Sequence, residues 1–266
     1  MELTYASRSD VGMIRAGNED SVHADATPQR GIFVVADGMG GHAAGEVASA
    51  MAVQIITREL GARTTASLDA AEAALREAIR AANRAIFDRT LSESEKQGMG
   101  TTVSVLILLA GHYLIGQVGD SRIYRWRDGQ LEQLTKDHSY VQEQVDAGYL
   151  TPAQARAHPY SNVITRCVGA TPDLQADTYR GELQAGDLFL VASDGLTGMV
   201  EDDRLHEIIA SKLSPGRLVD ALIHEANGHG GLDNITAIVV QVIAVDDGRS
   251  DLPTAEYPKI DSAPVP

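Results

Sequence analysis

The sequence predicts an α+β fold in which β-sheets are sandwiched between layers of helices. Apolar, β-branched runs of strand length are joined by short turns, among them Ala110-Gly111 and Gly119-Asp120, and such turns are typical of antiparallel strands. Longer segments that occur in pairs carry apolar residues at helical spacing instead. Strands that alternate with pairs of helices, and not with single helices, favour sheets covered by helix layers.

The first elements are a buried strand and a long helix. Residues 31–36 are short and β-branched, and Asp37-Gly38 is expected to end this strand. After a glycine-rich turn, a helix is expected from about Ala43 to Leu60. Its apolar face is expected to consist of Val47, Met51 and Ile55.

A second helix and a run of strands come next. The helix is expected over about 69–90, because Asp69 and Glu72 resemble a capping box at its start. Its apolar stripe is expected to be Leu75, Ile79, Ala82 and Ile86. Three strands are then predicted as an antiparallel meander, over residues 101–109, 112–118 and 121–127.

The second half of the chain predicts a strand over 187–192, two helices and a last strand over 235–243. Ser214-Pro215 begins the second of these helices, which ends near Gly228. The first, over about 202–212, has the stripe Leu205, Ile208, Ile209 and Leu213. Residues 139–160 are less apolar and are expected to form a helical or irregular insertion over the site. The proline-containing tail, 246–266, is expected to be disordered.

The composition limits the classes of protein. The 266 residues include 37 acidic and 22 basic side chains, a net charge of −15, which argues against binding nucleic acid or an anionic membrane. Cys167 is the one cysteine, so no internal disulfide forms, which fits a reducing compartment. The N-terminus lacks the pattern of a signal peptide, and the longest apolar run, 105–110, is far below the roughly 20 residues of a membrane span. We therefore expect a cytoplasmic protein, and we expect a monomer because no long exposed apolar patch is evident in the sequence.

Six acidic residues stand where a strand meets a turn, most of them beside a glycine or another small residue. They are Glu19, Asp20, Asp37, Asp120, Asp194 and Asp233. A single Asp-Gly after a strand more often marks an ordinary turn, but several together predict carboxylates that converge in space. Converged carboxylates repel one another and need cations, and hard oxygen ligands select magnesium or manganese. The sequence therefore predicts a metal-dependent enzyme.

Seven short motifs make this prediction specific. They are GMIRAGNED at 12–20, VVADGMGGHAAGE at 34–46, GTT at 100–102, VGDSRIYR at 118–125, LTKDHS at 134–139, VASDGL at 191–196 and DNITAIVV at 233–240. In this order they resemble the metal-dependent protein phosphatases, the PPM family or protein phosphatase 2C, and its compact bacterial members in particular. The resemblance covers roughly residues 5–242.

The resemblance implies an α-β-β-α sandwich of two antiparallel sheets flanked by helix pairs. It implies one catalytic domain over 1–245, with 139–160 as a flap insertion. It also implies a centre of two manganese or magnesium ions at one end of the sandwich. By position, Asp37 would bridge the two ions, Asp194 and Asp233 would complete one shell, and Glu19 with the Gly38 carbonyl would belong to the other.

Three further acidic or amide positions take roles from the same resemblance. Asp20 would orient metal-bound water. Asp120, together with Asp194, would hold a third and weaker ion. Asn234 would anchor the last loop through hydrogen bonds, and an ordinary turn residue beside Asp233 is the alternative.

The implied reaction is hydrolysis of phosphoserine and phosphothreonine in proteins, opposing a cognate serine/threonine kinase. A hydroxide that bridges the two ions would attack phosphorus in line. Arg15 offers two parallel donors to the phosphate, and a surface ion pair is its alternative role.

The proton donor for the leaving alcohol has more than one candidate in the sequence. Many eukaryotic members have a histidine where this chain has Met39. His42 is the candidate in this chain, with a structural role or a metal-bound water as alternatives. His138 is expected to stabilise the start of the insertion. Met39, Met99 and Trp126 are expected to serve packing.

Two other kinds of function remain open from the sequence. A phosphoprotein-binding pseudophosphatase, or scaffolding domain, would be expected to lack a bridging carboxylate, yet Asp37, Asp194 and Asp233 are all present. A structural metal-binding domain without turnover gives no reason for Arg15 to lie four residues before Glu19. Measuring the hydrolysis of a phosphate ester separates both from the enzyme.

Overall fold

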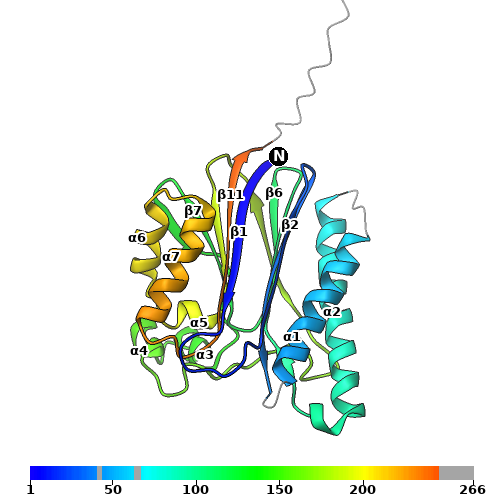
Figure 1. Cartoon of the computed structure of the whole chain (residues 1–266). Coiled ribbons are helices and arrows are strands. Elements are labelled where there is room, and N and C mark those ends of the chain that lie inside the picture. The colour runs from blue at the N-terminus through cyan, green and yellow to red at the C-terminus, as the bar shows by residue number, and fades with distance from the viewer. Residues whose placement is uncertain (41–43, 63–66, 246–266) are drawn as a thin grey trace, which may run out of the picture.

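Two β-sheets face each other in the middle of the molecule, and helices cover the outer face of each (Figure 1). The structure is a computed structural model and describes residues 1–40, 44–62 and 67–245. The strands of both sheets pair antiparallel. The predicted sandwich is therefore confirmed. The predicted tail, 246–266, and His42 lie outside the described residues.

The first sheet contains five strands and the second contains five in order plus one short strand beside them. In spatial order, the first sheet is β1 (Glu2–Asp10), β11 (Ile235–Ala244), β10 (Leu188–Ala192), β7 (Arg122–Arg127) and β8 (Gln130–Gln133). The second is β2 (Asp20–Ala26), β3 (Arg30–Met39), β5 (Val103–Leu109), β6 (His112–Val118) and β9 (Asp177–Glu182), and β4 (Gly100–Thr101) pairs with β3.

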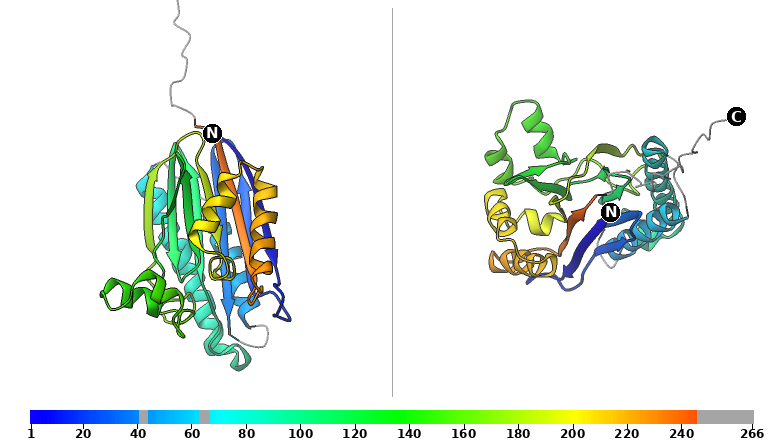
Figure 2. Two further views of the ribbon diagram at one scale, coloured as in Figure 1. Left: turned by 90° about the vertical axis from the view of Figure 1, so that its left-hand side faces the viewer. Right: turned by 90° about the horizontal axis from the view of Figure 1, so that it is seen from above.

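Helices form the two outer layers, which Figure 2 shows from two further sides. The second sheet is covered by α1 (Ala44–Gly61) and α2 (Leu68–Ser92), which η1 (Ser94–Lys96) follows. The first is covered by α6 (Asp202–Ala210) and α7 (Pro215–Gly228), with the short α5 (Asp194–Thr197) beneath them. The predicted insertion forms α3 (Tyr140–Asp146) and α4 (Pro152–Arg156), so its helical character is confirmed. Within the described residues, no helix is long and apolar enough to cross a membrane.

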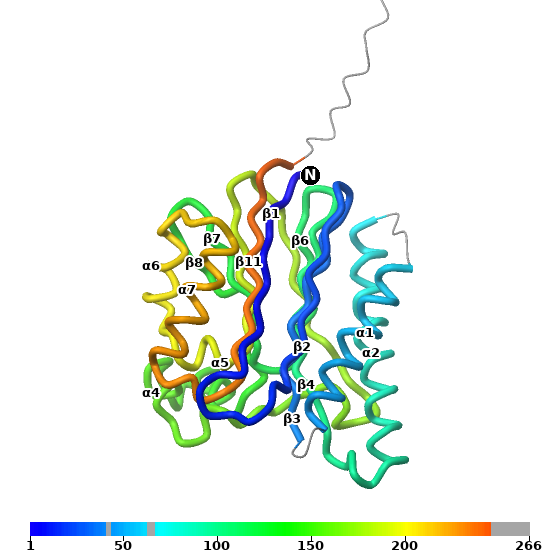
Figure 3. Tube along the Cα trace, in the orientation of Figure 1, coloured from blue at the N-terminus to red at the C-terminus, as the bar shows by residue number. Residues whose placement is uncertain are grey.

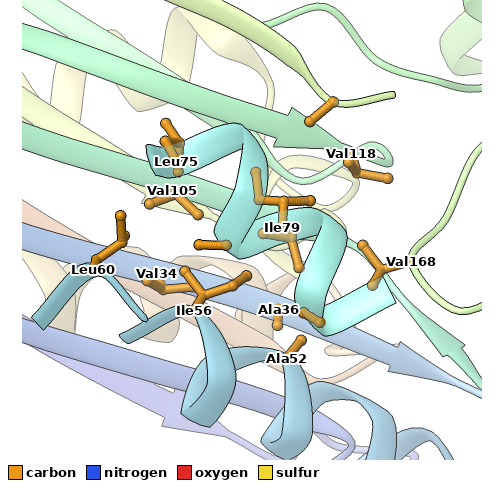
Figure 4. Close-up of a cluster of buried hydrophobic side chains, with 14 of the residues drawn as sticks. Val34, Ala36, Ala52, Ile56, Leu60, Leu75, Ile79, Val105, Val118 and Val168 are labelled. Carbon is orange, nitrogen blue, oxygen red and sulfur yellow. The ribbon is translucent and has the colours of Figure 1, made fainter. Parts of the chain in front are cut away.

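The core has three layers, one between the sheets and one under each helix pair. Strand β3 shows why, because successive side chains of a strand point to opposite faces. Val34 and Ala36 pack toward α1 and α2 (Figure 4), whereas Phe33 and Val35 pack between the sheets. Both faces of β3 are covered, so its apolar residues run without alternation.

Helix α1 meets the sheet with small residues. Ala48, Ala52 and Ile56 are fully buried, whereas the predicted stripe of Val47, Met51 and Ile55 is only partly buried. The predicted face was therefore wrong by about one residue. Alanines let the helix backbone approach the sheet and α2 closely, and the larger side chains fill the flank.

Helix α2 confirms its predicted stripe, since Leu75, Ile79, Ala82 and Ile86 are all buried. The predicted capping box was wrong. The Ser67 side chain accepts a hydrogen bond from the Ala70 amide at 3.1 Å and caps the helix. Asp69 therefore lies inside the first turn.

The predicted meander of three strands was wrong in its third member. Strands β5 and β6 form a hairpin, whose turn residues Ala110 and Gly111 have φ values of 47° and 76°, as tight hairpins require. Strand β7 instead pairs with β8 and β10 in the other sheet. The Gln117 side chain donates to the carbonyls of Gly119 and Ser121 and so supports this crossover.

Two smaller expectations also differ from the structure. Strand β3 continues through Asp37-Gly38 to Met39, because β4 supplies Thr101 and Gly100 as pairing partners beyond the end of β5. Leu213 lies beyond the end of α6 and is 37% exposed, so it does not belong to the apolar stripe of that helix.

Candidate metal centre

Acidic residues from both sheets converge at one end of the sandwich, the end at which Figure 3 shows the loop after β1 crossing below the strands. Asp20 and Asp37 are direct partners across β2 and β3, so their side chains lie on the same face. Asp194 begins α5, directly after β10, and Asp233 stands just before β11. Asp120 lies in the crossover from β6 to β7 and is 7% exposed.

The electrostatics of this cluster show how close the carboxylates are. Burial, followed by the neighbouring Asp20 and Asp194 carboxylates, raises the pKa of Asp37 well above its usual range. Burial is also the main cause that raises the pKa of Asp120 and of Asp194, and it raises the pKa of Asp20 to about 7. Raised pKa values in a group of neighbouring carboxyl groups are expected at a site that binds cations, because the charged carboxylates need positive charge nearby.

Glycines bring the Glu19 carboxylate and the backbone of Gly38 together. A Cβ atom on Gly38 would lie 2.1 Å from the Gly45 carbonyl oxygen and 2.6 Å from that of Glu19. A Cβ atom on Gly45 would lie 2.8 Å from the Glu19 carboxyl carbon. Both positions therefore require glycine, and the first turn of α1 lies against the Glu19 side chain. This juxtaposition fits the predicted pairing of Glu19 with the Gly38 carbonyl.

Buried hydroxyl groups hold the aspartates, a role that was not predicted from the sequence. The Thr102 hydroxyl accepts a hydrogen bond from the Asp37 amide at 3.0 Å and lies 2.8 Å from the Ser121 hydroxyl. The Ser193 hydroxyl donates to Asp20 Oδ2 at 2.9 Å and thereby links the two sheets. The feature of the sequence that could have identified these residues is that each is a serine or threonine inside the GTT, VGDSRIYR or VASDGL motif.

Arg15 lies at the rim of the cluster. Its guanidinium Nη2 donates to Asp233 Oδ2 at 2.6 Å, and the two side chains are 49% and 37% exposed. The other oxygen of Asp233 accepts from the Asn234 amide. A cation at the mouth of a group of carboxylates is where an incoming phosphate would be received, and the same position also forms the ion pair that was its alternative role.

Asn234 ties the loop after β1 to the start of β11. Its Nδ2 atom donates to the carbonyl oxygens of Val11 and Gly17, and its Oδ1 atom accepts from the Glu19 amide at 2.8 Å. The predicted anchoring role is confirmed. Asn234 thereby positions both Arg15, on the loop, and Glu19, at its end.

His138 supports the crossover that carries Asp120. Its Nδ1 atom accepts from the Gly119 amide at 3.1 Å, and its backbone amide donates to the Gly119 carbonyl. Its other ring nitrogen, Nε2, lies 3.2 Å from Asp177 Oδ2 and 3.1 Å from Arg166 Nη1. These contacts match the structural role expected of His138 at the start of the insertion.

The other candidate packing residues and one open cavity lie outside the cluster. Met99 is 1% exposed, and Trp126 packs against His206 in a tilted arrangement with ring centroids 4.8 Å apart, so both serve packing as predicted. An open cavity of about 510 Å³ is lined by Arg76, Arg80 and residues 175–179, between α2 and β9, and includes none of the six acidic residues.

The donor set fits divalent cations with hard oxygen ligands. Asp20 Oδ1 and Asp194 Oδ1 are buried and have no hydrogen-bond partner among the described residues, and a buried carboxylate oxygen without a partner is costly. In the described part of the chain, no three acidic, histidine or cysteine side chains already surround one point as a complete metal site. Asp37 and Asp194 share a hydrogen bond, and Asp233 forms an ion pair with Arg15.

The four-layer sandwich and the oxygen-rich cluster at one end of its sheets define the class of metal-dependent protein phosphatases. The sequence profile of the family described as "Protein phosphatase 2C" matches residues 15–216. The chain belongs to this family.

Two relatives show how far the similarity extends. The "Serine/threonine phosphatase stp" of Listeria monocytogenes serovar 1/2a is 40% identical over 248 residues, which are 91% of this chain and 97% of the relative. The "Serine/threonine protein phosphatase PstP" of Mycobacterium tuberculosis is 39% identical over 252 residues, 93% of this chain. That match spans only 46% of the relative, so this chain corresponds to about half of PstP.

Solved structures agree with the fold. The catalytic domain of PstP in complex with two manganese ions has a TM-score of 0.82 and 37% identity, and covers 91% of this chain and 99% of that domain. Stp1 from Staphylococcus aureus has a TM-score of 0.87 and 31% identity, and covers 92% of this chain and 96% of its own. The sandwich is therefore shared with bacterial serine/threonine phosphatases.

Proposed function

We propose that this chain is a metal-dependent protein phosphatase that hydrolyses phosphoserine and phosphothreonine in proteins and opposes a serine/threonine kinase. The observation that carries the proposal is the convergence of four aspartates whose pKa values are all raised, Asp20, Asp37, Asp120 and Asp194, beside the cationic Arg15. Family membership and the names of the relatives support the same activity. The comparisons give the pseudophosphatase alternative no support, and Asp37, Asp194 and Asp233, at least one of which it would be expected to lack, are all present in the sequence.

The cofactors in this proposal are two manganese or magnesium ions. When bound, they supply a water of lowered pKa as nucleophile and positive charge for the transferring phosphoryl group. Asp37, Asp194 and Asp233 would hold them together with Glu19 and the Gly38 carbonyl. A third, weaker ion would be held by Asp120 and Asp194.

The remaining residues of the site act on the substrate and on water. Arg15 would receive the phosphate oxygens, exchanging its contact with Asp233 for two parallel hydrogen bonds. Asp20, fixed by the Ser193 hydroxyl, would orient water and accept its proton through the free Oδ1 atom. His42 stays the candidate donor to the leaving alcohol. We further propose a cytoplasmic monomer that acts on phosphorylated proteins.

The test is hydrolysis of p-nitrophenyl phosphate and of a phosphothreonine peptide, with manganese or magnesium titrated in and then chelated. We expect turnover that requires the metal. Asp194→Ala should lower kcat by more than about a hundredfold, because even groups that only orient metal ligands contribute about 10–100-fold. Asp203→Ala, an exposed carboxylate on α6, is the matched control and should keep wild-type rates. A folded protein without turnover in either metal would refute the proposal.

A further inference from the structure

Exposed apolar side chains gather around Arg15, on two loops at the same end of the sandwich as the acidic cluster. Met13 and Ile14 are 66% and 67% exposed, Leu232 is 56% exposed and Val11 is 38% exposed. We call these four residues the apolar platform. Single exposed apolar side chains are ordinary on a protein surface, but here four of them flank the one arginine at the mouth of the site.

The platform is held in place and is not a loose loop. The Met13 amide donates to the Gly231 carbonyl at 2.8 Å, and the Gly12 amide donates to Asp10 Oδ1 at 2.9 Å. A Cβ atom on Gly231 would lie 2.9 Å from Met13 Cγ, so the two loops are in direct contact. With Asn234 bound to the Val11 carbonyl, the apolar side chains are displayed on a backbone that is tied down on both sides.

The position of the apolar platform beside Arg15 indicates which part of a substrate would contact it. A phosphate received by Arg15 belongs to a serine or threonine in an extended chain, in which each residue spans about 3.3–3.6 Å. The residues one or two places from the phosphoresidue are therefore within reach of Met13 and Ile14, which directly precede Arg15. The loop 11–17 contains no acidic residue in a chain of net charge −15, so this loop adds no negative charge that would repel an anionic phosphopeptide.

We propose that the apolar platform binds the residues that flank the phosphoresidue and that it selects phosphorylated segments with an aliphatic or aromatic side chain within two positions of it. This inference rests on the proposed phosphatase activity and adds a substrate class to it. Ile14 is the residue on which the selection depends most, because it is the most exposed of the four and adjoins Arg15.

The experiment compares phosphothreonine peptides that carry serine throughout with peptides in which leucine is placed singly at each of the four positions within two residues of the phosphothreonine. The quantity measured is the ratio of kcat/KM for a leucine peptide to kcat/KM for the serine peptide, determined with the same protein variant. An effect of the substitution on the chemical step changes both values equally and therefore cancels from the ratio. It is determined with manganese for the wild type, Ile14→Ser and Ile243→Ser. Ile243 is 43% exposed and lies at the opposite end of β11, where β1 begins, which makes it the matched control.

We expect at least one leucine position to raise kcat/KM by about tenfold in the wild type, mainly through KM, as partial burial of one apolar side chain gives. Ile14→Ser should reduce that ratio below about threefold, and Ile243→Ser should retain it, with all three proteins unfolding at similar temperatures because both positions are exposed.

Three results would overturn the inference. One is turnover of all peptides without a leucine preference in the wild type. Another is a preference that Ile14→Ser leaves intact. The third is a wild-type dimer in sedimentation that Ile14→Ser converts to a monomer without altering the ratio, because the platform would then be covered by a second copy of the chain. Absence of any metal-dependent turnover would instead refute the proposed function itself, so the two failures are distinguishable.

Discussion

Asn234 is the residue whose removal should reveal how firmly the two loops of the site are joined. It is 4% exposed, and its side chain makes three hydrogen bonds, to the carbonyls of Val11 and Gly17 and from the amide of Glu19. A typical hydrogen bond contributes about 1 kcal/mol net, so three give about 3 kcal/mol. Asn234→Ala also leaves three backbone groups in need of new partners, and we therefore expect the free energy of unfolding to fall by about 3 kcal/mol.

The measurement is urea unfolding in the presence of a chelator, so that metal binding does not contribute to the stability. Asn162→Ala is the control, because Asn162 is exposed and its side chain makes no hydrogen bond within the described residues. The control should stay within about 0.5 kcal/mol of the wild type. If Asn234→Ala does the same, the hydrogen bonds do not hold the loop and the reasoning fails.

The same variant separates anchoring from simple stability. Glu19 and Arg15 lie on the segment that Asn234 holds, so its loss should also raise the manganese concentration needed for half-maximal activity by about tenfold, as for other residues that orient metal ligands. A variant that loses stability but keeps the wild-type manganese dependence would make Asn234 a structural residue without influence on the site.

Three further outcomes are expected. Arg15→Ala should raise KM for phosphate esters by about tenfold or more, because it removes charge-assisted hydrogen bonds to the phosphate, and it should change the manganese requirement less. Arg15→Lys should restore only part of the lost substrate affinity. An unchanged KM in Arg15→Ala would contradict a role of Arg15 in phosphate binding. Asp37→Asn should abolish turnover yet raise the melting temperature in chelator, because burial and then neighbouring carboxylates already oppose ionisation of Asp37; a lower melting temperature would count against this account. In chelator, the free energy of unfolding should fall by about 1.4 kcal/mol per pH unit as the pH rises from 4 toward 7. The reason is that Asp20 has a pKa of about 7 in the folded protein and keeps a proton that the unfolded chain, in which its pKa is 3.8, has released. Urea unfolding from pH 5 to 8 tests this, and saturating manganese should make the free energy of unfolding depend less on pH.

Much of the fold follows from patterns within single segments. The stripe of α2 is clear in the sequence because Leu75, Ile79 and Ile86 differ strongly from the polar residues between them. Strands β5 and β6 are equally clear, since each is a short apolar run that ends in a turn. The position of β7 was not predictable in the same way, because choosing between a hairpin and a crossover after Gly119 depends on Gln117 and on the partner strand β10, which lies more than sixty residues later.

The outer strands were missed for a related reason. Strand β1 has mostly exposed and partly buried residues, and β8 and β9 are short and polar, so their sequences carry neither a continuous apolar run nor a clear alternation. These segments form strands because neighbouring strands provide backbone hydrogen-bond partners, as β11 does along the whole of β1. The alanine face of α1 was missed because close packing against the sheet selects small side chains, whereas sequence patterns favour the larger ones.

In the site, the carboxylates were predictable and their supports were not. An aspartate after a strand, as at Asp37 or Asp194, is chemically conspicuous wherever it stands. Thr102 and Ser193 resemble any small polar residue until the structure shows that they are buried and hydrogen-bonded to the aspartates. Their effect depends on a second segment of chain, which the sequence alone does not identify.

The division of the acidic residues between the two sheets gives the cations a structural consequence. Asp20 and Asp37 belong to the sheet beneath α1 and α2, whereas Asp194 and Asp233 adjoin strands of the other sheet. In the structure, repulsion between these carboxylates is opposed by a few polar links, such as that from the Ser193 hydroxyl to Asp20. Cations held between the two groups would replace repulsion with attraction across the sheet interface. Metal binding should therefore tighten the end of the sandwich at which the substrate is received, and it should do so most where Asn234 and Arg15 already join the loops.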